Sequence, residues 1–364
     1  MSAYMILMGV FFIQWLVFFP IGSAKIGKIR NNRQKSIFMI IVCIELICFA
    51  GLRAIDVGAD TETYIKALNY YKSFPKDSIL KQKLVWPFDF EDGYFLFTKI
   101  CAWLSMNETV FLFTIAILTY IPVCVFIYRY SEEPLISVYT YFAFSCFTYS
   151  LGIFRQMMAI SIILLGIQYI EKRELIRYMI VIGIAMLFHT TAIIMLPFYW
   201  IAQIRFKHRL YIFFILECAL LLTSRAVILI AVKVFPKYAG YVGGQYDKQG
   251  GSYLLLIVYN LIIVVAYFMA IREKNEKDKW MHISFCATGC ATLLLVLGYA
   301  MGIFGRIVPY YSIFLLILIP KIVNDYYGKN RIVMCALVMV CLIAMFYILN
   351  KSSIIVPYRT IKLI

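Results

Sequence analysis

Long apolar runs recur along the whole chain, and they constrain its fold more than any other feature. A helix needs about 20 residues to cross a hydrocarbon core of about 30 Å. Runs of that order lie at about 3–21, 37–52, 108–128, 135–150, 153–170, 178–203, 210–230, 253–271, 282–302, 305–323 and 332–349. They do not alternate apolar and polar residues as the strands of a membrane barrel would. The sequence predicts an all-α, polytopic transmembrane helical bundle of about 10–13 membrane helices.

Composition excludes the soluble alternatives. Of 364 residues, 63% are hydrophobic and 15% are charged, and the mean hydropathy is +0.85. A soluble globule has too little polar surface at this composition to cover its core. Disorder, coiled coils and soluble nucleic-acid-binding domains are excluded for the same reason. The net charge of +16 therefore indicates membrane orientation rather than an acidic partner such as nucleic acid.

Clusters of Lys and Arg in short loops predict which side of each helix is cytoplasmic. The clusters occupy about 25–35, 172–177, 205–209, 272–279 and 321–331. All of them lie on one side only if the run 178–203 enters the membrane and returns, with His189 near the turn. The same topology makes 93–106 a non-spanning or re-entrant helix. The chain is then a single integral membrane domain, 1–364.

Two long loops, about 53–93 and 231–252, fall on the extracytoplasmic side in this topology. The first holds seven of the nineteen acids, namely Asp56, Asp60, Glu62, Asp77, Asp89, Glu91 and Asp92. The second is rich in Gly and Tyr and is interpreted as a mobile lid or recognition loop. Loops of this length inside compact proteins are uncommon and are usually functional or disordered.

A few polar residues sit at the predicted outer ends of helices, where they do not serve as cytoplasmic anchors. They are Arg53, Arg155, Gln156, His189 and Arg306. Ionisable residues at membrane depth are costly, which makes them candidates for function. The alternatives are that each Arg reaches the outer headgroups and binds lipid phosphate, and that His189 is a hydrogen-bonded structural residue.

Other chemical signatures are missing from the sequence. The ten cysteines lie in apolar segments, where Cys acts as a small hydrophobic residue, and they lack the paired pattern of a zinc site. There is no Walker A loop and no GxSxG nucleophile elbow. We expect no metal and no cofactor.

Four motifs, in order along the chain, resemble those of the EpsG family of Wzy-type polymerases. These polymerases act on exopolysaccharide, capsule and O-antigen repeat units. The motifs are Gly51-Leu52-Arg53 with Val57-Gly58-Ala59-Asp60-Thr61 and Tyr64; Phe154-Arg155-Gln156 with Ala159; Phe188-His189-Thr190-Thr191-Ala192; and Gly305-Arg306 with Tyr310-Tyr311. Ala59 departs from the family, which more often has Thr there. The resemblance covers nearly the whole chain and implies a GT-C-like kinship.

The resemblance implies a glycosyltransferase that joins undecaprenyl-diphosphate-linked oligosaccharides at the extracytoplasmic face of the bacterial cytoplasmic (inner) membrane. Cationic side chains would hold the diphosphate, and a carboxylate or neutral His would take the proton of the acceptor hydroxyl. The implied base is Asp60 or His189. The implied substrate-binding residues are Arg53, Tyr64, Arg155, Gln156, Arg306 and Tyr310.

The implied partners are the lipid-linked oligosaccharide and membrane lipid, with a chain-length regulator as a further candidate and no nucleic acid. Two alternatives stay open. A flippase of lipid-linked oligosaccharides would place charged residues along a path at the midplane and show internal repeats. Another outer-face transferase, such as an O-antigen ligase, would use the same donor with a different acceptor.

Overall fold

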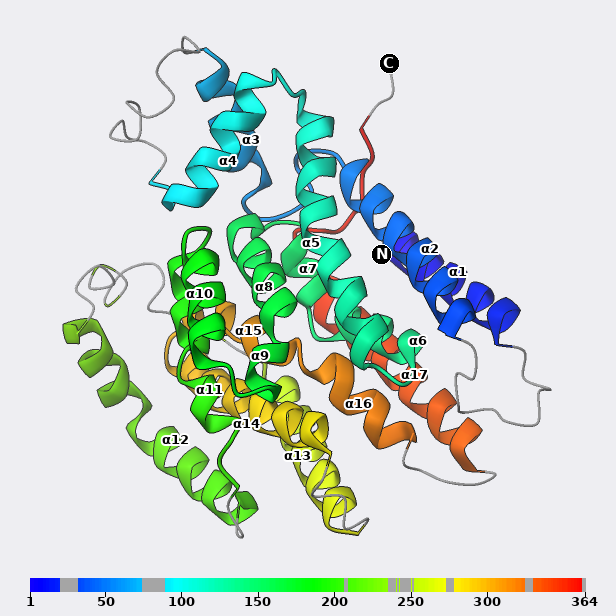
Figure 1. The fold of residues 1–364 in the computed structure, drawn as a ribbon, viewed down its shortest axis with the longest axis vertical. Helices are drawn as coiled ribbons and strands as arrows, with labels where there is room; N and C mark the ends of the chain where they lie inside the picture. Colours follow the sequence, from blue (N-terminus) through cyan, green and yellow to red (C-terminus); the bar gives the residue numbers. More distant parts are fainter. Residues whose placement is uncertain are drawn as a thin grey trace. The chain divides into compact units, whose positions relative to one another are not determined.

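The computed structural model describes residues 1–19, 32–73, 89–205, 209–234, 240, 242, 250, 252–272, 278–324 and 330–361 (Figure 1). The regular elements within these ranges are all helices. They form two compact units, Met1–Leu196 with Tyr326–Ile364, and Pro197–Asp325. The predicted all-α class of membrane protein is confirmed. The single membrane domain stays a prediction.

Among the described residues, five helices are long and apolar enough to cross a membrane. They are Asn32–Gly51, Glu108–Tyr130, Leu210–Lys233, Lys279–Ala300 and Val333–Asn350. A sixth span results if Gly302–Ser312 and Leu315–Asn324, bent by 55°, count as one. Four shorter apolar helices lie at Ser2–Phe18, Leu175–Met186, Thr190–Ile201 and Tyr253–Met269. Several of the apolar runs counted in the predicted 10–13 thus form short or interrupted helices. In the run 135–150, Ser145 adopts a left-handed conformation with φ 61° and separates two helices.

Six helices form one group in the first unit, which includes three of the candidate spans. They are α1 (Ser2–Phe18), α2 (Asn32–Gly51), α5 (Glu108–Tyr130), α6 (Pro134–Ala143), α7 (Cys146–Ser150) and α17 (Asn330–Asn350). Helices α2 and α5 pack closely, since a Cβ on Gly51 would lie 2.5 Å from the Phe113 ring. The C-terminal segment packs on the end of α2, where the Phe49 and Tyr358 rings stack at 4.1 Å.

A second group of helices in this unit carries the candidate site. It comprises α3 (Thr61–Lys72), α4 (Asp92–Trp103), α8 (Phe154–Gly166), α9 (Gln168–Glu171), α10 (Leu175–Met186) and the 3₁₀ helix η2 (Thr190–Met195). Figure 1 shows α3 and α4 side by side near the start of α5. Their shared core is aromatic, with Tyr64, Tyr71, Phe90, Tyr94 and Phe111 all buried. This packing fixes where α4 begins relative to α8.

The second unit is built around α14. Its helices are α11 (Phe198–Ile201), α12 (Arg209–Val234), α13 (Tyr253–Arg272), α14 (Lys279–Ala300), η4 (Gly302–Arg306), α15 (Pro309–Ser312) and α16 (Leu315–Asn324). Asp278 caps α14 by accepting hydrogen bonds from the Trp280 and Met281 amides, and its carboxylate also binds Lys321 at 2.6 Å. The cap therefore ties the start of α14 to α16.

The predicted interruption of the run 178–203 is confirmed. Helix α10 ends at Met186, and η2 begins at Thr190 with His189 as its N-cap. The predicted short helix at 93–106 is α4, of 12 residues. The expected outer loop 53–93 contains α3, and its residues 74–88 lie outside the described residues. Most of the expected loop 231–252 also lies outside them, while α12 extends to Val234.

Candidate active site

One carboxylate in the first unit binds side chains from two other segments. Glu91 Oε2 lies 2.6 Å from the Arg155 guanidinium, and Oε1 lies 3.0 Å from His189 Nδ1. The Thr190 amide and hydroxyl also donate to Oε1, at 3.1 and 3.3 Å. Arg155 and His189 were predicted from sequence as separate candidates. Glu91 brings them together.

The start of α4 is fixed by a direct backbone contact with the end of α10. The Gly93 and Tyr94 amides donate to the Leu187 carbonyl, at 2.8 and 3.2 Å. A Cβ on Gly93 would lie 2.8 Å from Leu187 Cβ and 2.9 Å from its carbonyl oxygen, so a larger residue would force the helices apart. Gly93 therefore holds Glu91 beside the His189 turn.

Arg155 is the second residue of α8, and aromatic rings surround it. Its guanidinium lies 5.0 Å from the centre of the Phe90 ring, and the Tyr64 hydroxyl accepts a hydrogen bond from it. Tyr64 itself stacks on Phe154 at 4.8 Å. Arg155 Nε is buried and has no hydrogen-bond partner among the described residues. The guanidinium is held in place, yet it retains an unused donor.

The electrostatics favour an ionised Glu91. Burial alone would raise the pKa of Glu91, but the hydrogen bond from His189 and the positive charge of Arg155 outweigh it and lower the pKa to about 2. An ionised carboxylate accepts hydrogen bonds and cannot donate them. His189 Nδ1 must therefore carry the shared proton, which leaves Nε2 with a free lone pair whenever the ring is neutral.

The cluster of Glu91, Arg155 and His189 is only partly exposed to solvent. The side chains of Glu91, Arg155 and His189 are 16%, 24% and 21% exposed, respectively. A half-buried position strengthens charge interactions relative to open water and still leaves room for a ligand to approach.

Arg53, in contrast, forms its hydrogen bonds with backbone carbonyls. It is 2% exposed, and its guanidinium donates to the carbonyls of Ala50, Val57 (3.3 Å) and Leu151 (3.0 Å). Burial lowers the pKa of Arg53 to about 10, which leaves it protonated at neutral pH. The prediction of a phosphate-binding Arg53 rested on residue type and position. In the structure these donors join the end of α2 to the turn before α8.

The segment after Arg53 packs tightly on the same turn. Gly58 has φ +114°, and a Cβ there would lie 2.1 Å from the Leu151 carbonyl oxygen. Thr61 Oγ1 is 3.1 Å from the Val57 carbonyl oxygen and 3.0 Å from that of Leu151. The motif around Gly58 and Thr61 thus sets the position at which α8 begins, and with it the position of Arg155.

The remaining predicted residues are divided between the two units. In the first unit, Asp60 is the N-cap residue of α3, and Gln156 is buried in α8. The carboxylate that binds His189 is Glu91 rather than Asp60. In the second unit, Arg306 ends η4 and is exposed, whereas Tyr310 is buried in α15.

The cluster combines three chemical capabilities. Arg155 offers a cation suited to phosphate oxygens. His189 offers a base whose tautomer is set by its neighbour, and Glu91 stabilises the imidazolium that forms when that base takes a proton. The part of the chain that the structure describes has no group of three His, Cys, Asp or Glu side chains that could hold a metal ion.

Comparison with known proteins identifies one family. Residues 36–360 match the EpsG family, which covers nearly the whole chain. No curated protein and no solved structure matches. The match, together with the apolar helices, indicates a multi-pass membrane protein with a polymerase-type role in exopolysaccharide biosynthesis.

Proposed function

The chain belongs to the EpsG family, and on that premise we propose that it polymerises undecaprenyl-diphosphate-linked oligosaccharide repeat units at the extracytoplasmic face of the bacterial inner membrane. The products are exopolysaccharide, capsule or O-antigen chains. The observation that carries the proposal is the Glu91 carboxylate, which binds Arg155 on one oxygen and His189 on the other.

The reaction needs a base and a cation. A hydroxyl oxygen of the acceptor sugar attacks the anomeric carbon of the donor, and the bond from that carbon to the diphosphate oxygen breaks. The hydroxyl proton passes to His189 Nε2, the electron pair leaves with undecaprenyl diphosphate, and a new glycosidic bond remains. The leaving group supplies the driving force, so no nucleotide is consumed.

Each residue of the cluster has a separate task. His189 is the general base, because Glu91 holds its Nδ1 proton and directs Nε2 outward as the acceptor. Arg155 binds the departing diphosphate through the donors that Glu91 does not use. Glu91 orients both side chains and offsets the charge on the imidazolium. Tyr64 positions Arg155 through its hydrogen bond to the guanidinium, and Gln156 remains a candidate substrate ligand.

Two predicted substrate ligands take different places in this proposal. Arg53 acts as a positioning residue, since its guanidinium bonds backbone carbonyls at the turn before α8. Arg306 remains a candidate for binding anionic sugar or phosphate, because it is exposed at the end of η4. Tyr310 is buried one turn later and supports the helix that follows Arg306.

The test is reconstitution of the full-length protein with purified lipid-linked repeat units and no ATP. A ladder of lengthened glycans is expected, and it should be lost in His189→Ala and Arg155→Ala. A flippase would leave the repeat units at their original length. A ligase would lengthen nothing unless a separate acceptor were added. Either of the last two results would overturn the proposal.

A further inference from the structure

The C-terminal segment, residues 351–361, pairs with the backbone that follows α2. The Ala54 amide donates to the Arg359 carbonyl at 2.8 Å, and the Ile361 amide donates to the Leu52 carbonyl at 3.0 Å. The two bonds form an antiparallel bridge. The segment is therefore bound by main-chain hydrogen bonds to a stretch of the chain about 300 positions away.

Side chains add to this backbone pairing. The Tyr358 ring stacks on Phe49 at 4.1 Å, and its hydroxyl donates to the Phe49 carbonyl at 2.7 Å. Arg359 forms an ion pair with Asp56 at 2.8 Å, with side chains that are 61% and 36% exposed. Because exposed ion pairs contribute little, Tyr358 is the main side-chain anchor of the C-terminal segment.

The stretch that pairs with the segment is the one that sets where α8 begins. Arg53, within this stretch, donates to the Leu151 carbonyl at 3.0 Å. Its guanidinium also lies 5.2 Å from the centre of the Phe154 ring. Phe154 is the first residue of α8, and Arg155 follows it directly. The C-terminal segment is thus connected to Arg155 through Arg53 and Phe154.

A second route leads to the same turn through α7 and α17. The Phe147 ring of α7 lies 6.0 Å from that of Phe49. The next residue, Thr148, donates its hydroxyl proton to Oδ1 of Asn350 at 2.7 Å. Asn350 is the last residue of α17 and is 2% exposed, and its Nδ2 donates to the Phe346 carbonyl. The end of α17 and the segment after it therefore contact both stretches that meet at the turn before α8.

We propose that the C-terminal segment is a positioning element for Arg155, with Tyr358 as its principal positioning residue. The segment holds the turn before α8 and thereby the place at which the guanidinium meets Glu91 and the substrate. Its catalytic consequence rests on the proposed polymerase function, whereas its hold on α8 does not. A displacement of about 1 Å at a reacting group can lower a rate by about 10²-fold, so the segment affects catalysis without unfolding of the protein.

The first measurement is hydrogen–deuterium exchange of the full-length protein in detergent, without substrate. Tyr358→Ala removes both the stack and the hydrogen bond to Phe49. It is expected to speed exchange of the amides in the first two turns of α8 by about tenfold. Tyr358→Phe keeps the stack and should change exchange less. Arg359→Ala should also have a smaller effect, because its ion pair with Asp56 is exposed.

The second measurement is chain extension with lipid-linked repeat units in proteoliposomes. Tyr358→Ala should lower kcat/KM for the donor by about tenfold, and Tyr358→Phe should restore most of it. Added to Arg155→Ala, the Tyr358→Ala change should cause little further loss, because the segment acts through Arg155. A purely stabilising segment would lower Tm, leave kcat/KM per folded molecule unchanged and so overturn the proposal.

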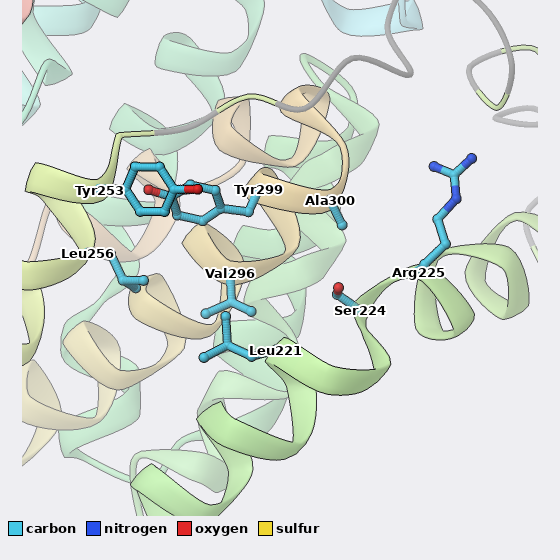
Figure 2. A pocket seen from close by; sticks show the side chains of 8 residues that line it. All are labelled: Leu221, Ser224, Arg225, Tyr253, Leu256, Val296, Tyr299 and Ala300. Carbon is cyan, nitrogen blue, oxygen red and sulfur yellow. The ribbon is translucent and has the colours of Figure 1, made fainter.

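Tyr253→Ala is the matched control. Tyr253 also packs against another ring, that of Tyr299 at 4.5 Å, but it belongs to the second unit. There it lines a cavity of about 530 Å³ among α12, α13 and α14 (Figure 2). The control should change neither exchange in α8 nor kcat/KM for the donor.

Two results would overturn the proposal. One is exchange in α8 that is the same in wild type and Tyr358→Ala. The other is an equal effect of Tyr253→Ala and Tyr358→Ala on that exchange. A wild-type protein that makes no polymer would overturn the proposed function alone, and the exchange measurement would still decide whether the segment holds α8.

Discussion

Glu91 Oε1 lies 3.0 Å from His189 Nδ1, although 98 positions separate the two residues in the chain. The other carboxylate oxygen holds Arg155 at 2.6 Å. A carboxylate that binds both side chains couples the protonation of His189 to the position of Arg155. When the imidazole takes a proton, Glu91 offsets the new charge while it still holds Arg155.

Neutralising Glu91 tests this coupling most directly. Glu91→Gln keeps the size of the side chain, removes its charge and allows a tautomer of His189 without a proton on Nδ1. We expect kcat for repeat-unit polymerisation to fall by about 10²-fold or more. The measurement is the rate of chain extension with lipid-linked repeat units in proteoliposomes.

Glu62→Gln is the matched control for this experiment. Glu62 lies on α3, is exposed and pairs with Lys66 one helical turn away, at 3.6 Å. Exposed pairs of this kind contribute little to stability, so the variant should behave as wild type. A fully active Glu91→Gln protein would remove Glu91 from the site.

Two substitutions of Arg155 should separate the effect of its charge from the effect of its planar shape. Arg155→Ala is expected to lower kcat/KM for the lipid-linked donor by about 10²-fold. Arg155→Lys should recover part of the lost kcat/KM, because the positive charge remains. Recovery should be incomplete, because one ammonium group cannot bind Glu91 and a phosphate at the same time as the planar guanidinium can. The double variant with Glu91→Gln should lose less than the two single losses combined, with a coupling of about 1 kcal/mol. Strictly additive losses would separate Arg155 from Glu91.

The sequence predicted the helical class and the break at His189, because both follow from local patterns. Apolar runs identify membrane helices, and His189-Thr190-Thr191 interrupts one of them. The lengths of the individual helices could not be predicted in the same way, since hydropathy does not register a break such as the left-handed Ser145.

The candidate site was predicted in part. Arg155 and His189 stood out as polar residues at helix ends, but Glu91 was one of seven acids in 53–93 and carried no periodic signal. Its role depends on tertiary packing between α4 and α10. The local signal that could have found it is Gly93, a glycine in the first turn of a helix. The backbone contacts of Arg53 could not be predicted either, because its residue type does not reveal that the carbonyls of Ala50, Val57 and Leu151 surround it.

Replacement of Arg53 should act on stability first. Arg53→Ala removes the guanidinium donors to the carbonyls of Ala50, Val57 and Leu151. The Thr61 hydroxyl can donate to only one of the last two, and each carbonyl left buried without a donor costs about 1–3 kcal/mol. We expect lower expression and a clearly lower Tm in detergent. An Arg53→Ala protein that keeps the wild-type Tm but makes no polymer would instead support a substrate-binding role for Arg53.

Gly58 offers a similar test of the backbone. Gly58→Ala forces a Cβ toward the Leu151 carbonyl at a positive φ, which should cost about 2 kcal/mol or more. Gly183→Ala is the matched control, because nothing lies within 4 Å of a Cβ at that helical position. Its Tm should be equal or higher, since Ala favours a helix. Equal effects of the two variants on Tm would show that the contact at Leu151 does not matter.

The pH dependence of stability should report the ionised Glu91. Its pKa is about 2 in the folded protein against an ordinary value of 4.5, so the unfolded state binds more protons between these values. The stabilisation that Glu91 supplies is complete above about pH 4.5 and is lost as the pH falls toward 2. Wild type should therefore exceed Glu91→Gln in Tm at pH 5 and above, and the gap should narrow as the pH falls below about 4.5. Thermal unfolding in detergent from pH 3 to 8 measures it. A gap that closes between pH 5 and 7, or one unchanged down to pH 3, would contradict the assignment of a strongly lowered pKa to Glu91.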